Sequence, residues 1–282
     1  MIGIFDSGYG GLTILKQIRG QLPGYNYLYL GDNARAPYGT RSFECIYRYT
    51  LEAVQYLFGQ GCTLVILACN TASAKALRTI QQKDLPRMNA EWLAAGDERK
   101  RNVLGVIRPT VEIVPSLTRT KHVGVMATSG TVASGSYQIE LHKQDASLVV
   151  TQQACPMWVP LIESGEHTSD GARFFIRKYV QQIIARDPLI DTILLGCTHY
   201  PIIQPLIDEV LAKVCDHPCR TIAQGSIVAS SLKDYLNRHT EIEQHVQKGG
   251  ECTYLTTDDA ARFDQAATLF LGEQVRAEHV EY

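Results

Sequence analysis

The sequence lacks several features that would assign it to a specialised class. None of its apolar runs reaches the roughly 18 residues that a membrane-spanning helix needs. Its 27 lysines and arginines nearly balance 29 aspartates and glutamates, so the net charge of −2 gives no case for binding nucleic acid or an anionic membrane surface. No basic leader, cleavage site or low-complexity stretch is present, and Met1 leads directly into an apolar run. We therefore expect a cytoplasmic globular protein with no nucleic-acid or membrane partner.

Signals for cofactors and metals are also absent. The glycines Gly8, Gly10 and Gly11 do not form a dinucleotide fingerprint, because the third glycine comes too early. The eight cysteines are scattered and should mostly be free thiols in a reducing compartment. The segment Cys215–Cys219 holds two thiols and a histidine, but no second Cys/His pair lies close in sequence, so it makes a poor zinc site. We predict that the protein uses no cofactor and no metal.

Apolar runs with the length of buried strands alternate with segments of helical periodicity, which is typical of an α/β protein with mostly parallel sheets. The predicted strands are Ile2–Phe5, Tyr27–Leu30, Leu64–Leu67, Val103–Ile107, His122–Met126, Leu148–Gln152, Thr192–Leu195 and Thr221–Ala223. The predicted helices are Leu12–Gln21, Ser42–Phe58, Ala72–Gln82, Val111–Leu117, Ser169–Ala185 and Ile202–Val214. The tail Ile227–Tyr282 mixes helix and short strand, and we expect it to pack on the first half.

The two halves of the chain carry the same elements in the same order. Ile2–Gly8 resembles Val123–Gly130, and each is followed later by an apolar run that ends in a small residue and a cysteine, Cys69 or Cys197. We predict two pseudo-symmetric α/β domains, residues 1–103 plus 227–282 and residues 104–226, with the active site in the cleft between them. The charged segment Lys83–Asn102 is predicted to be a surface insertion joining the halves, and the strand Val103–Ile107 to open the second half.

Both cysteines fall in strand-to-helix turns, where open α/β sheets bind ligands. A single buried cysteine could simply be a small core residue. Two thiols on opposite sides of one molecule instead suggest two bases. Since a helix N-terminus favours the thiolate, one sulfur could remove a proton from carbon while the other delivers a proton to the opposite face.

Polar residues near the predicted strand ends could assist such a reaction. Asp6 either caps the helix that follows or accepts a bond from a ligand amine or a catalytic partner, and His199 could polarise a thiol. Glu163 is predicted to start a helix after a turn bracketed by two prolines. The donors available to stabilise a carbanion are Thr71, Thr128, Thr131 and Thr198, together with backbone N–H groups.

Two other classes of protein are compatible with parts of this pattern. A two-lobed α/β binding protein would hold a small anion between its halves, but it would normally carry an export signal and has no use for paired thiols. A cysteine hydrolase could use Cys197 with His199, but Cys69 would then be unexplained.

Five motifs together resemble the glutamate racemase family. They are Asp6-Ser7-Gly8, Pro37-Tyr38-Gly39, Ala68-Cys69-Asn70-Thr71-Ala72-Ser73, Pro160-Leu161-Ile162-Glu163 and Gly196-Cys197-Thr198-His199-Tyr200-Pro201. The resemblance runs from residue 2 to about residue 230, with the motifs in the family's order.

The resemblance implies cofactor-independent interconversion of L- and D-glutamate, which supplies D-glutamate for bacterial peptidoglycan. It implies that Cys69 is the base toward D-glutamate and Cys197 the base toward L-glutamate, assisted by Asp6, Glu163 and His199. The substrate-binding residues it implies, with the threonine donors above, are Asp6, Ser7, Pro37, Tyr38, Gly39, Asn70, Thr71, Thr198 and His199. Aspartate racemases usually carry Glu after the second Cys-Thr, so His199 favours glutamate. We also expect a homodimer.

The chain departs from the family pattern at several positions. Tyr9 replaces the usual Val, Arg108 replaces the usual Glu, and Ala223–Ser226 replaces a usual Asp-Ser. Because the chain starts at the first strand, we expect no control by an activator bound to an N-terminal extension. None of these changes removes a predicted catalytic group.

Overall fold

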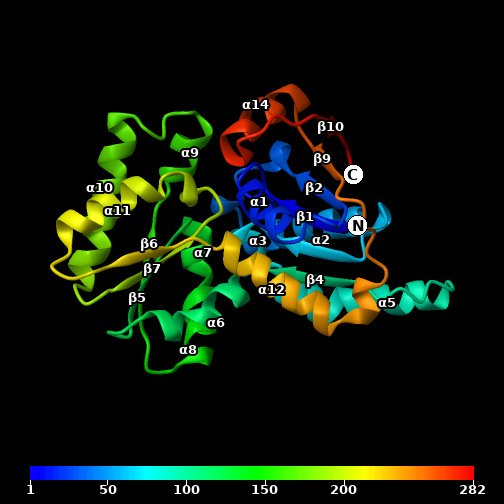
Figure 1. The fold of residues 1–282 in the computed structure, drawn as a ribbon, viewed down its shortest axis with the longest axis horizontal. Helices are drawn as coiled ribbons and strands as arrows, with labels where there is room; N and C mark the ends of the chain where they lie inside the picture. Colours follow the sequence, from blue (N-terminus) through cyan, green and yellow to red (C-terminus); the bar gives the residue numbers. More distant parts are fainter. The chain divides into compact units, whose positions relative to one another are not determined.

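The computed structural model describes all 282 residues and divides them into two compact units. The first comprises Met1–Val106 with Gly225–Tyr282, and the second comprises Ile107–Gln224 (Figure 1). Each unit holds one sheet, and every strand pairing within the two sheets is parallel. The predicted α/β class with parallel sheets is confirmed. No helix combines the length and apolarity that crossing a membrane would require.

The sheet of the first unit has six strands in the order β10-β9-β2-β1-β3-β4. Their bounds are β1 (Ile2–Asp6), β2 (Tyr27–Gly31), β3 (Leu64–Leu67), β4 (Asn102–Gly105), β9 (Cys252–Thr256) and β10 (Ala277–His279). Every residue of β1, β2 and β3 is buried. Such strands are covered on both faces, which is why they read as unbroken apolar runs. The tail of the chain supplies two strands of this sheet, β9 and β10.

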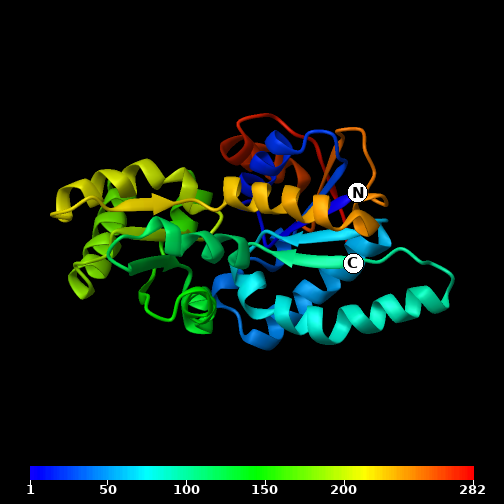
Figure 2. The same ribbon diagram turned by 60° about the horizontal axis from the view of Figure 1, so that its bottom comes forward.

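Helices cover both faces of the first sheet. They are α1 (Leu12–Gln21), α2 (Phe43–Gly59), α3 (Asn70–Lys75), α4 (Leu77–Thr79), α5 (Leu85–Ala94), α12 (Gly225–Arg238), α13 (Thr240–Glu243) and α14 (Ala260–Leu271). Figure 2 shows α12, in orange, and α5, in turquoise, on opposite faces of the sheet. Three short turns complete the unit: η1 (Asn33–Arg35), η2 (Tyr38–Thr40) and the π-helical η3 (Ile80–Asp84).

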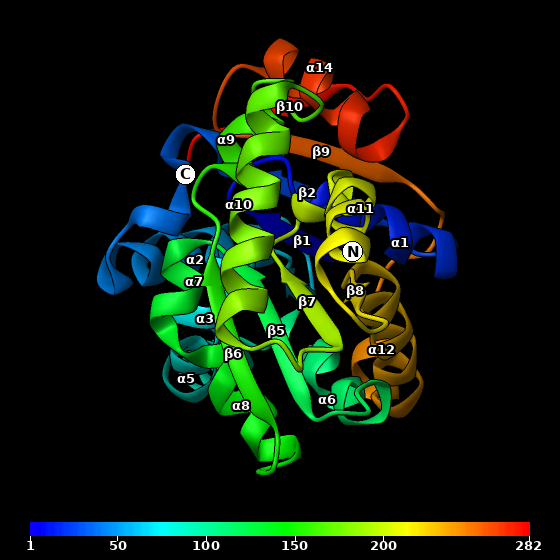
Figure 3. The same ribbon diagram turned by 90° about the vertical axis from the view of Figure 1, so that its left-hand side faces the viewer.

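The sheet of the second unit has four strands in the order β6-β5-β7-β8. They are β5 (His122–Ala127), β6 (Val149–Ala154), β7 (Thr192–Gly196) and β8 (Arg220–Ile222). The helices are α6 (Ile107–Leu117), α7 (Ser129–Ser134), α8 (Ser136–Gln144), α9 (Trp158–Glu163), α10 (Asp170–Arg186), η4 (Tyr200–Ile202) and α11 (Gln204–Val214). In Figures 1 and 3, α10 and α11 lie on one face of this sheet, with α6 and α8 on the other.

The two sheets repeat one topology. The order β2-β1-β3-β4 in the first matches β6-β5-β7-β8 in the second. The register also matches, since Gly3 lies opposite Val65 and Gly124 lies opposite Ile193. The internal repeat predicted from the sequence is therefore present in the strand order and in the pairing.

The segment Lys83–Asn102 differs from its predicted form as a surface insertion. It continues the helical run through η3 into α5, where Leu85 and Met88 are buried. Trp92 packs edge-on against Phe58, and the Arg101 guanidinium lies 3.9 Å from the Trp92 ring centroid. One apolar stripe of α5 thus joins the core, although the charged residues around it suggest a surface insertion.

The strand predicted at Val103–Ile107 also has a different place. It is β4, which ends at Gly105 and pairs in parallel with β3 of the first sheet. The expectation that it opens the second half is wrong, because Ile107 already begins α6 in the second unit. The residues of an apolar strand do not by themselves indicate which of two sheets the strand joins.

Candidate functional site

The first predicted thiol, Cys69, lies just past the carboxyl end of β3. It is the N-cap of α3, and its sulfur accepts a hydrogen bond from Ala72 N–H at 3.5 Å. The thiol also donates to Ser7 Oγ at 3.4 Å, and the residue is 6% exposed. The first turn of α3 contains Asn70 and Thr71, both buried. The strand end therefore places a nearly buried thiol beside hydroxyl and amide groups.

Asp6 ends β1, the strand next to β3. Its carboxylate is buried and accepts a hydrogen bond from Gly8 N–H at 2.9 Å. The N-cap of α1 is Gly11, and a Cβ added there would lie 2.6 Å from Asp6 Cβ. Glycine is needed here because the start of α1 passes so close to the Asp6 side chain. The loop of residues 7–11 is thereby held against the strand end.

The motif Pro37-Tyr38-Gly39 enters the 3₁₀ turn η2, which packs against α3. The Tyr38 ring is buried, and its hydroxyl donates a hydrogen bond to Asp32. Burial and the neighbouring Asp32 carboxylate hold the pKa of the Tyr38 hydroxyl far above its usual value. Since that hydroxyl is engaged with Asp32, what Tyr38 and Gly39 offer a ligand is their backbone.

The second predicted thiol, Cys197, directly follows β7 and is 6% exposed. Its sulfur lies 3.8 Å from His199 Nδ1, and His199 Nε2 lies 2.8 Å from Glu163 Oε1. Glu163 is the last residue of α9, not the first residue of a helix as the sequence suggested. The helix begins at Trp158, and its Trp158 and Ile162 side chains are buried in the core. A thiol, an imidazole and a carboxylate thus form a row within the second unit.

The electrostatics of this row favour a charged imidazole. Burial opposes a proton on His199, but hydrogen bonds to Cys197 and Glu163, with the negative charges of both groups, raise the pKa of His199 to about 10. At neutral pH the ring is therefore an imidazolium between a carboxylate and a sulfur. A neighbouring cation of this kind stabilises a thiolate.

Two buried contacts fix the segment that carries Glu163 to the segment that carries His199. The Trp158 ring packs edge-on against Tyr200, with centroids 4.7 Å apart. The Tyr200 hydroxyl donates to the Cys155 carbonyl at 3.3 Å. Neither Trp158 nor Tyr200 is predicted as a support from the sequence. The signal that points to them is their position, five residues before Glu163 and one residue after His199.

The remaining predicted groups of the second unit gather at the same sheet edge. Thr128 is the N-cap of α7; it accepts from Thr131 N–H at 3.3 Å, and the two hydroxyl oxygens lie 3.1 Å apart. Thr128 follows β5, which pairs with β7 up to the residue before Cys197. Thr198 follows Cys197 in the sequence, and its side chain is buried.

Cys69 and Cys197 occupy equivalent positions in the repeat. Cys69 lies four residues after Val65, the partner of Gly3, and Cys197 lies four residues after Ile193, the partner of Gly124. Their surroundings differ, because Asp6 of the first unit corresponds in this register to Ala127 of the second. One thiol has an aspartate on the neighbouring strand, whereas the other has a histidine and a glutamate.

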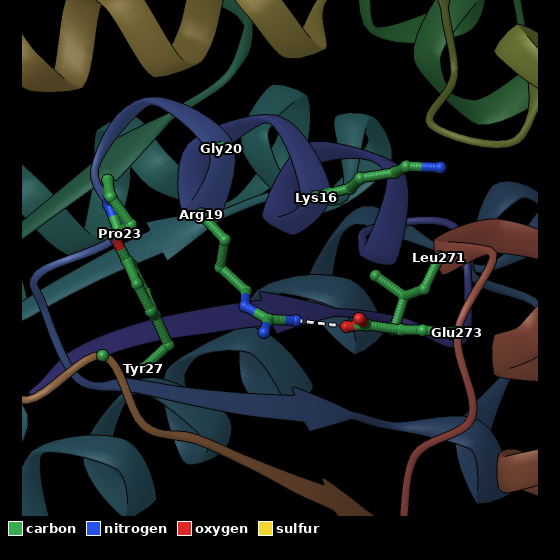
Figure 4. A pocket seen from close by; sticks show the side chains of 8 residues that line it. Lys16, Arg19, Gly20, Pro23, Tyr27, Leu271 and Glu273 are labelled. Atoms are coloured by element: carbon green, nitrogen blue, oxygen red, sulfur yellow. Dashed lines mark hydrogen bonds and ion pairs between the residues drawn. The ribbon is translucent and has the colours of Figure 1, made fainter.

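Nowhere does the structure gather three or more His, Cys, Asp and Glu side chains that could hold a metal ion. A cavity of about 300 Å³ in the first unit is lined by Lys16, Arg19, Tyr27 and Glu273 among others (Figure 4). Its Arg19 is paired with Glu273 and donates to the Tyr254 hydroxyl at 3.0 Å, so this cation serves the chain's own contacts.

Three comparisons with known proteins all find racemases. The model of the Asp/Glu/Hydantoin racemase family matches residues 12–224. The glutamate racemase of Roseobacter denitrificans is 39% identical over 284 residues, covering 97% of this chain and 97% of that protein. Two crystal structures are also similar. Glutamate racemase isoform RacE1 from Bacillus anthracis has a TM-score of 0.84 at 30% identity, covering 100% of this chain and 97% of that one.

The second is glutamate racemase from Francisella tularensis in complex with D-glutamate. Its TM-score is 0.82 at 29% identity, and the match covers 99% of this chain and 97% of that one. The family match spans most of the chain, and the similarity to named glutamate racemases extends over nearly its whole length. The chain therefore belongs to the Asp/Glu/Hydantoin racemase family and, within it, to the glutamate racemases, which are isomerases.

Proposed function

We propose that this protein interconverts L- and D-glutamate without a cofactor, using Cys69 and Cys197 as two bases on opposite faces of the substrate. The observation that carries the proposal is the equivalent placement of the two thiols at the strand ends of two repeated sheets. The D-glutamate in the Francisella tularensis relative supports the choice of substrate. The proposal requires both thiols to reach one bound molecule.

The chemistry follows from the two sets of neighbours. With L-glutamate bound, the Cys197 thiolate takes the Cα proton, so the Cα–H bond breaks and an S–H bond forms. The Cys69 thiol then gives its proton to the opposite face of Cα, which leaves the D-enantiomer and a Cys69 thiolate. D-glutamate reacts by the reverse route, with Cys69 as base. The His199 imidazolium faces the Cys197 sulfur, and Glu163 balances the charge on the ring.

The carbanion formed between these steps needs stabilisation by fixed donors. We assign the binding of glutamate's polar groups to two sets of residues. In the first unit these are Asp6, Ser7, Asn70, Thr71 and the backbone of Pro37-Tyr38-Gly39. In the second they are Thr128, Thr131, Thr198 and His199. We assign Asp6 to receive the substrate's ammonium group or to assist Cys69.

Solvent deuterium tests the two-base mechanism. In deuterated water, early D-glutamate made from L-glutamate should carry deuterium at Cα, while unreacted L-glutamate stays largely protiated. Cys69→Ala or Cys197→Ala should lower racemisation at least ~10²–10⁴-fold, the usual contribution of an acid–base group. Cys215→Ala, which removes a partly exposed thiol elsewhere, is the matched control. Early product that keeps its original hydrogen, or near-normal activity of Cys197→Ala, would refute the mechanism.

Substrate size is a separate test. Glutamate should be turned over with a far higher kcat/KM than aspartate, because the His199 motif is the glutamate form of the family pattern. A comparable kcat/KM for aspartate would show that this assignment of substrate is wrong.

The biological setting is part of the proposal. We propose that the enzyme acts in the cytoplasm, supplies D-glutamate for peptidoglycan and is a homodimer. We further propose that each unit of the chain is a domain with its own half of the site. Light scattering of the eluted protein tests the dimer, and restored growth of a D-glutamate auxotroph tests the role.

A further inference from the structure

A buried carboxylate anchors the loop that carries Pro37, Tyr38 and Gly39. Asp32 directly follows β2 and has no exposed surface. It accepts hydrogen bonds from the Tyr38 hydroxyl and from Thr257 Oγ1, the latter at 3.0 Å. An isolated buried carboxylate is costly, so Asp32 needs a cation as well.

Arg35 supplies that cation. Its Nε lies 2.7 Å from Asp32 Oδ2, and another of its nitrogens donates to Glu52 at 2.5 Å. The guanidinium also lies over two aromatic rings, 4.4 Å from the Tyr49 centroid and 5.0 Å from the Tyr282 centroid. A planar guanidinium suits this arrangement, since it can stack on aromatic faces while its edge makes hydrogen bonds.

Tyr282 reaches this position from the far end of the sequence. The strand β10 pairs with β9, and Val280 N–H donates to the Thr256 carbonyl at 2.9 Å. Beyond this strand the Tyr282 ring stacks on Tyr56, with centroids 4.8 Å apart and planes at 26°. The Tyr282 ring therefore contacts Tyr56 of α2 and the Arg35 guanidinium.

We propose that Tyr282 is a positioning residue for substrate binding: it holds Arg35 on Asp32 and thereby fixes the loop of residues 32–40. The inference rests on the proposed function, because the loop binds glutamate only if the Tyr38-Gly39 assignment is right. The Tyr38 hydroxyl is engaged with Asp32, so the loop offers glutamate its backbone. Backbone donors bind well only when the loop that carries them is rigid.

Hydrogen exchange tests the positioning step without substrate. Four amides report on the loop: Ala34 to Thr257 Oγ1, Arg35 to the Asp32 carbonyl, Ala36 to the Asn33 carbonyl and Arg41 to the Tyr38 carbonyl. In Tyr282→Ala, a peptide covering residues 32–41 should exchange faster than in the parent protein. Tyr282→Phe keeps the stacked ring and should restore the parent rate. Unchanged exchange in Tyr282→Ala would overturn the proposal.

Steady-state kinetics gives the functional measurement. Tyr282→Ala should raise the KM for glutamate about fivefold, the scale of one lost cation–π contact, with kcat within about twofold of the parent value. Tyr282→Phe should keep the parent KM. The control Tyr25→Ala removes a ring whose centroid lies 5.7 Å from Lys248 Nζ and whose hydroxyl donates to Glu243, and it should leave KM unchanged. An equal KM increase in the control would overturn the proposal.

A double variant keeps the test specific to Arg35. If Tyr282 acts through Arg35, combining Tyr282→Ala with Arg35→Lys should raise KM no further than Arg35→Lys alone. Additive effects would overturn the coupling. A parent protein without racemase activity would instead refute the proposed function, and the exchange measurement would still decide the role of Tyr282.

Discussion

His199 Nε2 lies 2.8 Å from Glu163 Oε1, and the other ring nitrogen faces the sulfur of Cys197. The carboxylate and the sulfur thus keep a proton on a ring that burial alone would leave neutral. This arrangement belongs to the second unit only, since Thr71 takes the register position of His199 in the first. The two thiols therefore have different polar neighbours: Ser7 Oγ and the Ala72 N–H lie beside Cys69, and His199 lies beside Cys197.

Glu163→Gln should slow racemisation while leaving the fold intact. The amide oxygen can still accept a hydrogen bond from His199, but the negative charge that supports the imidazolium is gone. We expect kcat/KM to fall roughly 10²-fold. Since L- and D-glutamate have equal free energies in achiral water, the fall must be the same in both directions. Initial rates measured by chiral chromatography from each enantiomer check this.

The matched control is Glu166→Gln, which changes an exposed carboxylate shortly after α9. It should retain the parent kcat/KM. If Glu163→Gln were as active as this control, Glu163 would have no part in supporting His199.

The raised pKa of His199 predicts how stability depends on pH. Its folded-state pKa of about 10 exceeds the ordinary value of 6.5, so folding favours the protonated ring. The resulting stabilisation is complete below about pH 6.5 and is lost as pH rises toward 10. Urea unfolding at a series of pH values should therefore show the parent protein losing stability across this range relative to His199→Gln. His279→Gln, which alters an exposed histidine, should follow the parent protein. Parallel curves for the parent and His199→Gln would contradict the assigned charge.

Chelation should not affect the reaction. The proposed proton transfers use only the two thiols and their neighbours, so racemisation should survive dialysis against a strong chelator. The check is the initial rate before and after dialysis, with and without added metal or pyridoxal phosphate. A loss of activity that returned on adding either would exclude the cofactor-independent mechanism.

Local patterns predicted much of the fold and of the candidate site. The buried strands β1 and β3 read as unbroken apolar runs, and the strand–Cys–helix turn appears twice, so both thiols could be placed at strand ends. Their equivalence depends only on short segments around Cys69 and Cys197. What local patterns could not provide was pairing between distant segments. The strand β4 could not be assigned to a sheet from its own residues.

The same limit applies to the supports of the site. Tyr282 contacts Arg35 only because β10 joins the first sheet, and nothing near Tyr282 in the sequence indicates this. In the segment Lys83–Asn102, the many charged residues suggest a surface segment, although Leu85 and Met88 of α5 pack on the core. Pro160 suggests a late helix start and so predicts Glu163 at the first turn, whereas the helix begins at Trp158 and ends at Glu163.

Two glycines next to or within α1 provide a final test of how Asp6 is held. Alanine at Gly11 would bring Cβ within 2.6 Å of Asp6 Cβ and 3.0 Å of Ala68 Cβ, so the start of α1 must move away from the strand ends. We expect Gly11→Ala to cost about 1–3 kcal/mol of folding stability and to lower kcat/KM, because Asp6 is displaced. Gly20, inside α1, has no atom within 4 Å of an added Cβ. Gly20→Ala should therefore stabilise the protein by about 0.5–1 kcal/mol through helix propensity and leave kcat/KM unchanged. Urea unfolding and initial rates of the two variants measure both effects. Equal stability of the two variants would mean that the close approach of Gly11 to Asp6 does not constrain the fold. Full activity of Gly11→Ala would mean that the reaction does not depend on the position of Asp6.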